Sequence, residues 1–266
     1  MIPKLLFIRL IINGLFLAVS VMLTLLLVSK INFKHKKTAF ILVFLVIFII
    51  FQQVLYHIAF PKLNMLYASY VISKGPIYKI AMEVDPSLSL NDIITDEARS
   101  ALRRRNGAGE AISVATQNMM AVILRDLPRF SDEAVEHYFR VTHERMKQLR
   151  TVSPDTCAKI IFPEIYGIPD TNYIQDREED IQAIRLLVES ANVNNQQRFD
   201  REEGERAMAN ILQQSYPGLD DDLSKGDSGK ICSIVISMND KVLALPQHQR
   251  GNTIKAVLLK GIETTK

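Results

Sequence analysis

Two long apolar runs open the chain and predict a pair of membrane-spanning helices. The first, Leu5–Val28, would rise roughly 36 Å as a helix, which is enough to cross a bilayer. Its notably polar side chains are few: Arg9, Asn13, Ser20 and Thr24. The second run, Ala39–Ala59, reaches the roughly 20 residues that a span needs only by including Gln52 and Gln53. We therefore expect a two-helix transmembrane hairpin over residues 1–60.

The charges that flank these runs predict an orientation. The linker Lys30–Lys37 holds four lysines in eight residues, which the positive-inside rule places in the cytoplasm. Both termini would then lie on the opposite side, where aromatic residues suit the membrane interface: Tyr56, Phe60, Tyr67 and Tyr70. A cleaved signal peptide is the competing interpretation of the first run. That run is too long for the apolar region of a signal, and no clear small-residue cleavage site follows it.

Polar side chains in the second run predict contacts between helices. Gln53 and His57 are four residues apart and share one helix face, next to Gln52. In a bilayer such groups form hydrogen bonds with neighbouring helices, and Asn13 in the first run is a suitable partner. We expect hairpin packing or self-association here. An ion or proton path through an oligomer is the alternative.

Beyond the hairpin the pattern changes twice. Residues 61–80 mix apolar, tyrosine and lysine side chains without any acidic residue, which predicts a juxtamembrane segment near lipid headgroups. Gly75–Pro76 is its expected break. Residues 81–266 then show helical periodicity and predict one helical soluble domain. The expected fold class is mostly α, with this domain following the hairpin.

Capping residues and apolar spacing place the helices of this domain. The clearest helix begins after Ser131, which is a suitable N-cap. Ser89 and Asp92 form a capping-box start for a helix that should run to about Arg105. Further helices are predicted over about 110–124, 154–162, 174–191 and 199–214. Residues 230–262 fit either two helices or a small sheet, and the helical surroundings favour helices.

Charge divides the chain at the same place. Residues 1–60 hold six basic side chains and no acidic one, whereas the rest holds 26 basic and 29 acidic residues. The formal net charge of +3 therefore comes from the hairpin. An acidic soluble part has no chain-wide basic field, so we expect no nucleic-acid partner.

The motifs that suggest chemistry are all incomplete. His143–Glu144 begins the zinc-binding pattern H-E-x-x-H, but Lys147 stands where the second histidine belongs. His137 and His143 lie about 120° apart around a helix, so we expect both on a solvated charged face and no metal site. Gly226–Gly229 matches a tetrapeptide of trypsin-like proteases without their all-β pattern, and is expected to be a turn. We expect no cofactor.

The densest basic cluster of the soluble part lies at the end of the helix predicted after Ser89. It consists of Arg99, Arg103, Arg104 and Arg105. Cations near a helix C-terminus interact favourably with the helix dipole, so a solvated helix end explains the cluster. Contact with a phosphate or an anionic lipid is the second hypothesis, and it gains support only if the domain is cytoplasmic.

The chain has two cysteines, Cys157 and Cys232. Neither has a second cysteine at metal-ligand spacing. If the domain is exported, we expect a disulfide between them, contributing about 4 kcal/mol in the chain-entropy model. If the domain is cytoplasmic, two buried thiols are expected instead.

Amphipathic helices beside an apolar hairpin favour a non-catalytic interaction or assembly protein. We expect the hairpin to lie in a bacterial inner membrane, with a periplasmic helical domain that binds another envelope protein. The expected partners are the lipid bilayer, that protein and a second copy of the chain. One alternative is a membrane-tethered hydrolase that uses His137, Glu144 or the loop Asp220–Asp222. A second is an oligomeric channel or transport accessory.

Overall fold

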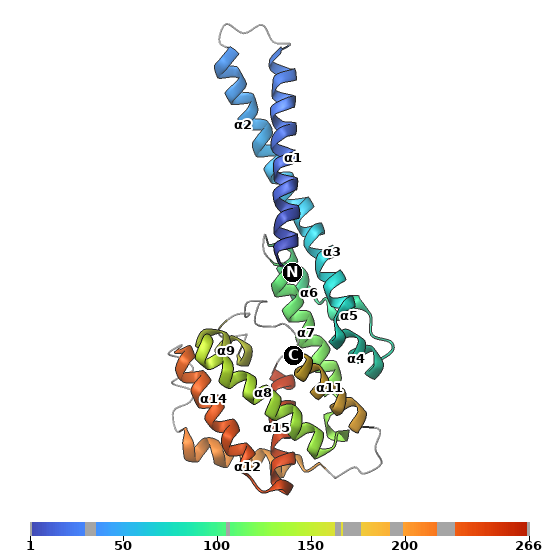
Figure 1. Ribbon diagram of the computed structural model, residues 1–266, viewed down its shortest axis with the longest axis vertical. Coiled ribbons are helices and arrows are strands. Elements are labelled where there is room, and N and C mark those ends of the chain that lie inside the picture. Colours follow the sequence, from blue (N-terminus) through green and yellow to red (C-terminus); the bar gives the residue numbers. More distant parts are fainter. Residues whose placement is uncertain are drawn as a thin grey trace. The chain divides into compact units, whose positions relative to one another are not determined.

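The computed structural model describes residues 2–29, 36–104, 107–162, 166, 177–191, 199–216 and 227–264. All regular elements within these ranges are helices, which confirms the mostly α fold class (Figure 1). The chain forms two compact units. Unit 1 comprises Met1–Tyr70 and Arg99–Ala108, and unit 2 comprises Val71–Ala98 and Gly109–Lys266.

Unit 1 contains a hairpin of two long helices. Helix α1 spans Ile2–Ser29, and α2 spans Lys36–Val54. They pack against each other, with the rings of Phe16 and Phe51 5.3 Å apart. The second helix continues through a π-helical turn, η1 (Leu55–Ala59), into α3 (Phe60–Lys74). It ends at the predicted break, because Gly75 leaves the helical conformation and Pro76 starts α4 (Pro76–Val84).

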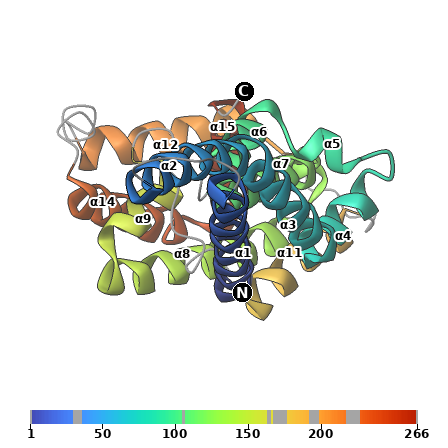
Figure 2. The same cartoon turned by 90° about the horizontal axis from the view of Figure 1, so that it is seen from above.

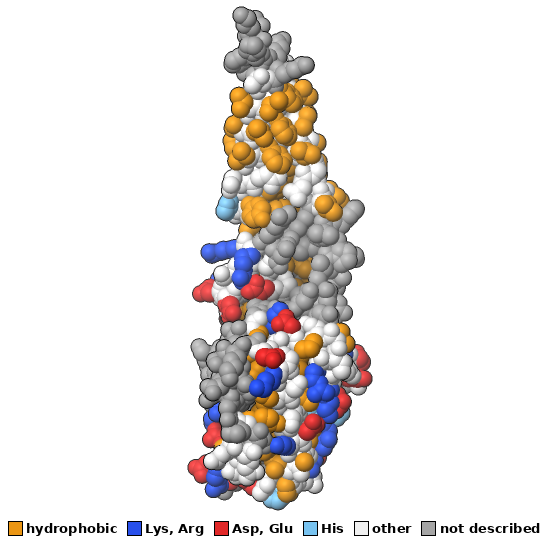
Figure 3. Space-filling model, turned by 90° about the vertical axis from the view of Figure 1, so that its left-hand side faces the viewer, with side chains coloured by type: hydrophobic (Ala, Val, Ile, Leu, Met, Phe, Trp, Pro, Cys, Tyr) orange, Lys and Arg blue, Asp and Glu red, His pale blue; other side chains and the backbone are white. Residues whose placement is uncertain are grey.

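The apolar side chains of α1 and α2 point mostly outward. Two helical stretches are long and apolar enough to cross a membrane: Leu10–Ser29 and Phe40–Lys74. Only 17% and 6% of their most apolar windows are buried, unlike a core helix of a soluble protein. Figure 3 shows these side chains as an apolar band. The polar residues Ser20 and Thr24 are buried, and their hydroxyls donate to the backbone oxygens of Phe16 and Ser20.

The helix predicted from Ser89 to about Arg105 is two shorter helices, so that prediction was wrong in its extent. The capping box of Ser89 and Asp92 is present and starts α5 (Leu90–Ile93). Helix α6 then spans Asp96–Arg103. Ile94 leaves the helical conformation, and both Ile93 and Ile94 are buried. The side chain of Asn118 donates to the Ile93 carbonyl oxygen at 2.9 Å, so a contact distant in sequence accompanies the break.

Unit 2 is a cluster of helices around α8. The remaining elements are α7 (Ala108–Leu124), η2 (Leu127–Arg129), α8 (Asp132–Val152), α9 (Pro154–Ile161), α11 (Glu178–Ser190), α12 (Arg201–Ser215), α14 (Ser228–Leu243) and α15 (Gln247–Thr264). Helix α8 packs against α9, α11, α14 and α15 (Figures 1 and 2). Ser131 caps α8 as predicted, its Oγ accepting from the Ala134 nitrogen.

Residues 230–262, whose pattern fits either helices or a small sheet, form helices, as predicted. Asp227 caps α14 by accepting from the Lys230 nitrogen, 3.0 Å away. Ser228, the serine of the protease-like tetrapeptide, is therefore the first residue of a helix. Residue 226 and the loop Asp220–Asp222 lie outside the described residues.

The two cysteines meet in the core of unit 2. Cys157 on α9 and Cys232 on α14 are at disulfide-bonding distance, with their Cα atoms 5.8 Å apart. Both are fully buried. They pack with Leu149 and Ile236, and partly buried apolar side chains surround this cluster: Met146, Ile160 and Ile161. The pair therefore joins α9 to α14 inside an apolar environment.

Candidate interaction site

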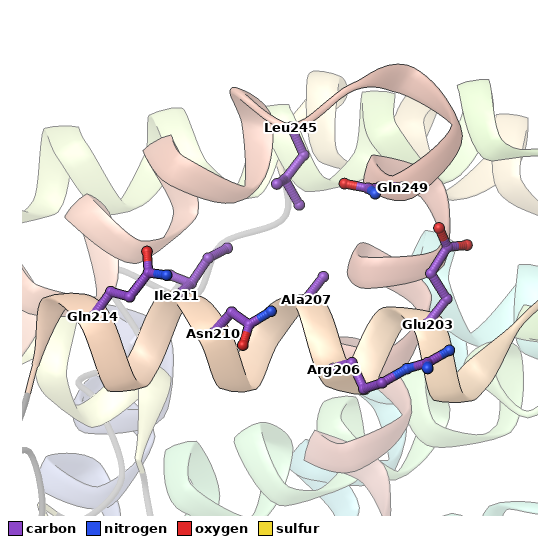
Figure 4. Close-up of a pocket in the computed structure, with 8 residues that line it drawn as sticks. All are labelled: Glu203, Arg206, Ala207, Asn210, Ile211, Gln214, Leu245 and Gln249. Carbon is purple, nitrogen blue, oxygen red and sulfur yellow. The ribbon is translucent and has the colours of Figure 1, made fainter.

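A groove in unit 2 runs along one face of α12, opposite the turn between α14 and α15 (Figure 4). Its volume is about 410 Å³. Eight residues line it: Glu203, Arg206, Ala207, Asn210, Ile211, Gln214, Leu245 and Gln249. The α12 residues recur at helical spacing from Glu203 to Gln214, so this face is roughly 16 Å long.

The groove has an apolar floor and polar edges. Ile211 is 8% exposed, and Ala207 and Leu245 are partly buried beside it. Polar side chains surround these three residues: Glu203, Arg206, Asn210, Gln214 and Gln249. An apolar centre with a polar rim is typical of protein interaction surfaces. The rim supplies amide donors and acceptors, one carboxylate and one guanidinium.

Asn252 and Gly204 fix α12 against α15. The Asn252 side chain accepts from the Asp200 nitrogen at 3.1 Å and donates to Glu203 Oε2 at 2.7 Å. Asp200 in turn caps α12 by accepting from the Glu203 nitrogen. Gly204 sits so close to α15 that a Cβ there would be 2.3 Å from the Asn252 carbonyl oxygen. Glycine is therefore required for this helix contact.

Arg250 fixes the opposite wall. Its Nε and Nη2 donate to the Leu245 carbonyl oxygen at 3.2 and 3.0 Å, and its Nη1 lies 2.6 Å from Glu136 Oε1 on α8. Desolvation by itself would raise the pKa of Glu136, but the hydrogen bonds from Arg140 and Arg250 outweigh it and lower the pKa. The carboxylate therefore stays ionised and holds the Leu245 turn in place.

A buried ion pair also attaches α15 to α8. Lys255 Nζ lies 2.7 Å from Asp132 Oδ1 and 5.9 Å from the centre of the Phe199 ring. The Lys255 side chain is 1% exposed. Gly251 leaves room for this arrangement, because a Cβ there would be 2.3 Å from Asp132 Cγ. This pairing holds the first turn of α8 next to the helix that carries Asn252.

His143 is buried, which contradicts the expectation of a solvated face. It is 1% exposed, and its Nε2 lies 2.7 Å from Asp240 Oδ1 on α14. It lies four residues after Phe139 and so joins the buried stripe of α8. An ionised carboxylate only accepts hydrogen bonds, so Nε2 carries the proton. Nδ1 has no hydrogen-bond partner among the described residues.

Asp240 is shared between His143 and a lysine. Lys147 Nζ lies 3.1 Å from the same oxygen, Oδ1, and 3.2 Å from Glu144. Desolvation would raise the pKa of Asp240, but the hydrogen bonds from His143 and Lys147 lower it. The hydrogen bond to Asp240 is the main reason that the pKa of Lys147 is raised. A catalytic triad needs a nucleophile hydrogen-bonded to the histidine, and within the described ranges the bonding partner of His143 is Asp240.

The polar residues of the two long apolar helices are only partly brought together. His57 Nε2 lies 3.0 Å from Gln53 Oε1 on the same helix, and both side chains are exposed. Gln52 and Asn13 are half-buried. Among the described contacts, Gln53 pairs with His57 and not with Asn13. The interhelical use of these groups stays a prediction.

The other predicted site residues lie apart from the groove. His137 and Glu144 lie on α8 and do not line it. Arg99, Arg103 and Arg104 are exposed in unit 1, and Arg105 lies outside the described residues. Sequence reasoning missed the groove itself. Its local signal was Gly204 inside an amphipathic helix pattern, where an isolated glycine indicates a close packing contact.

No family model, curated protein or solved structure matches this chain.

Proposed function

We propose that this protein is a membrane-anchored interaction module, in which an apolar hairpin tethers a helical unit that binds another protein of the cell envelope. The groove along α12 carries this proposal, because it combines an apolar floor with polar edges on two rigidly held walls. Its occupant is a segment of a partner protein. The hairpin lies in a bacterial inner membrane, and unit 2 lies in the periplasm.

The outward-facing hydrophobic residues support the anchor. Leu15 and Met22 on α1 are 60% and 63% exposed, and they belong to a helix whose most apolar window is only 17% buried. Water would make such a surface costly, whereas lipid tails would not. The buried hydroxyls of Ser20 and Thr24 bond to their own helix, as backbone and side chains must where no water is present.

The cysteine pair supports the proposed periplasmic location of unit 2. Disulfides persist in oxidising compartments, and the bacterial periplasm is one. Cys157 and Cys232 are far apart in sequence, yet the fold brings them to bonding distance without any third cysteine to compete. The lysine-rich linker favours the same arrangement, because it belongs in the cytoplasm.

Site-specific photocrosslinking in intact cells tests the binding surface. A photoreactive amino acid replaces Asn210 or Gln214 in the groove, and Arg150 on the exposed side of α8 serves as the control. We expect one discrete adduct at both groove positions and none at Arg150. Adding Ile211→Arg, which places a charge in the apolar floor, should remove that adduct. Equal adducts at Arg150, or adducts that persist with Ile211→Arg, would contradict the proposal.

A further inference from the structure

Unit 1 is strongly basic, because the fold brings together two basic stretches that lie apart in the sequence. Its two stretches, Met1–Tyr70 and Arg99–Ala108, contain eleven basic residues and no acidic one. Unit 2 contains the other 21 basic residues and all 29 acidic ones. The arginine cluster follows the hairpin by about forty residues, yet it belongs to the same compact unit as the hairpin.

Asn64 makes this connection. Its side chain is fully buried on α3, and its Nδ2 donates to the carbonyl oxygens of Leu102 and Arg104, at 2.9 and 3.0 Å. These oxygens lie at the C-terminal end of α6, where carbonyl groups have no partner within the helix. One side-chain amide therefore caps α6 and holds its basic end against α3.

Gly107 completes the attachment. A Cβ on Gly107 would overlap the carbonyl oxygen of Ala101, so only glycine allows the chain to turn back so closely after α6. Ala101 and Leu102 are buried at this point. The side chains of Arg99, Arg103 and Arg104 remain exposed. The segment thus buries its apolar residues and displays its cations.

The position of Asn64 along the second helix sets the depth of the cluster. Counting about 20 residues of span from Thr38 places His57 at the far boundary of the hydrocarbon core. Asn64 is seven residues further along, roughly 10 Å at helical rise. Headgroups occupy roughly 5–8 Å outside the hydrocarbon core. The end of α6 is therefore held just outside the headgroup layer, from where long arginine side chains can reach back to the lipid phosphates.

We infer that Arg99, Arg103 and Arg104 form a binding site for the phosphate groups of anionic membrane lipids, positioned by Asn64. Arginine suits this ligand because its guanidinium forms paired hydrogen bonds with phosphate. The acidic residues Asp96 and Glu97 begin α6, about two turns before Arg103 but only three and two residues before Arg99. This inference rests on the proposed membrane anchoring, and it adds a second contact that holds unit 1 on the bilayer surface.

Lipid selectivity of the full-length chain tests the inference. The protein is reconstituted in phosphatidylcholine vesicles that contain a trace of spin-labelled phosphatidylglycerol or spin-labelled phosphatidylcholine. The motionally restricted fraction of each label gives the preference for the anionic lipid. We expect R99Q/R103Q/R104Q to lower this preference at least about threefold, since each basic group near an anionic surface contributes measurably. The lysine-rich linker accounts for the preference that remains.

Two further variants distinguish position from charge. R129Q/R150Q/R185Q removes the same charge from exposed sites in unit 2 and should leave the preference unchanged. Asn64→Leu keeps every arginine but removes both hydrogen bonds to α6, and should lower the preference as the triple variant does. A triple variant with the wild-type preference, or an equal loss in the unit 2 control, would overturn the site. If Asn64→Leu keeps the wild-type preference for the anionic lipid, Asn64 does not position the arginines.

The source of the phosphate and the anchoring itself are tested separately. Replacing chloride with inorganic phosphate at equal ionic strength should leave the preference unchanged. A selective loss in phosphate would assign the site to free phosphate and overturn the lipid assignment. Alkaline extraction of the same vesicles reports anchoring, so a chain that washes off contradicts the proposed function. A chain that resists extraction but shows no anionic preference contradicts only this inference.

Discussion

Unit 1 and unit 2 are both built from helices, yet they treat apolar side chains in opposite ways. Unit 1 displays them: Leu15 is 60% exposed, and its neighbours along α1 are similar. Unit 2 buries them around α8 and places its charges outside, with Lys255 and His143 as paired exceptions. Helix formation alone therefore does not determine whether the apolar side chains of a helix are exposed or buried. The distribution of polar residues around each helix does.

The α1–α2 hairpin and unit 2 also satisfy buried polar groups by different means. In the hairpin, Ser20 and Thr24 bond to backbone oxygens of their own helix. In unit 2, Asn252 and His143 instead bond across helices, from α15 to α12 and from α8 to α14. Cross-helix bonds specify how helices pack, so unit 2 has a defined groove. Four predictions test this contrast.

The largest effect is expected from removing the cysteine pair. Cys157→Ala with Cys232→Ala should lower the free energy of unfolding of unit 2 by about 4 kcal/mol, because the closed loop no longer restrains the unfolded chain. Denaturant titration of the full chain in detergent, followed by circular dichroism, measures this. The helical signal of the hairpin should persist after unit 2 has unfolded. A loss below about 1 kcal/mol would contradict the role assigned to the pair.

A charge on the surface of each unit tests whether the two surfaces face different solvents. Leu15→Arg in α1 should disfavour membrane insertion by about 3 kcal/mol. Val152→Arg in unit 2 replaces an even more exposed side chain, at 70%, and should change stability by less than about 0.5 kcal/mol. The inserted fraction after alkaline extraction gives the first value. Equal tolerance of both substitutions would show that α1 does not face lipid.

Two glycines in unit 2 should respond with opposite signs. Gly204→Ala forces a Cβ into the Asn252 carbonyl and should cost about 2 kcal/mol. Gly229→Ala places its Cβ at ordinary contact distances from Asp227 and Pro154, and should be neutral or stabilising by up to about 1 kcal/mol. Thermal unfolding of both variants makes the comparison. A harmless Gly204→Ala would mean that α12 and α15 are not held together as described.

The smallest effect concerns pH. The lowered pKa of Asp240 means that its contribution to stability is present above the ordinary pKa of 3.8 and is lost as pH falls through the lower folded value. Asp240 is 52% exposed, so solvent screening limits the effect to on the order of 0.5 kcal/mol. The difference between the unfolding midpoints at pH 7 and pH 3 should be smaller in Asp240→Asn than in the wild type. If this difference is the same in both proteins, the contacts of Asp240 with His143 and Lys147 do not cause the pH dependence of stability.

Capping residues and helical periodicity predicted most of the helices. Contacts between residues distant in the sequence could not be predicted. Ser131 and the stripe after it are local, so the start of α8 was correct. The single possible cysteine pairing needed no geometry. The break after Ile93, the hydrogen bond of His143 to Asp240 and the capping of α6 by Asn64 involve partners 25 to 97 residues away. Periodicity along one helix carries no information about such partners.

The central claim, a helical unit held outside the cytoplasm by an apolar hairpin, is tested most directly by cysteine labelling in intact cells. Single cysteines replace Asn32 in the lysine-rich linker and Arg150, which is exposed on α8, in a chain with Cys157 and Cys232 replaced. The reagent is a maleimide that crosses the outer but not the inner membrane. We expect the cysteine at 150 to be labelled at once and the cysteine at 32 only after permeabilisation. The reverse pattern, or labelling of both positions without permeabilisation, would contradict it.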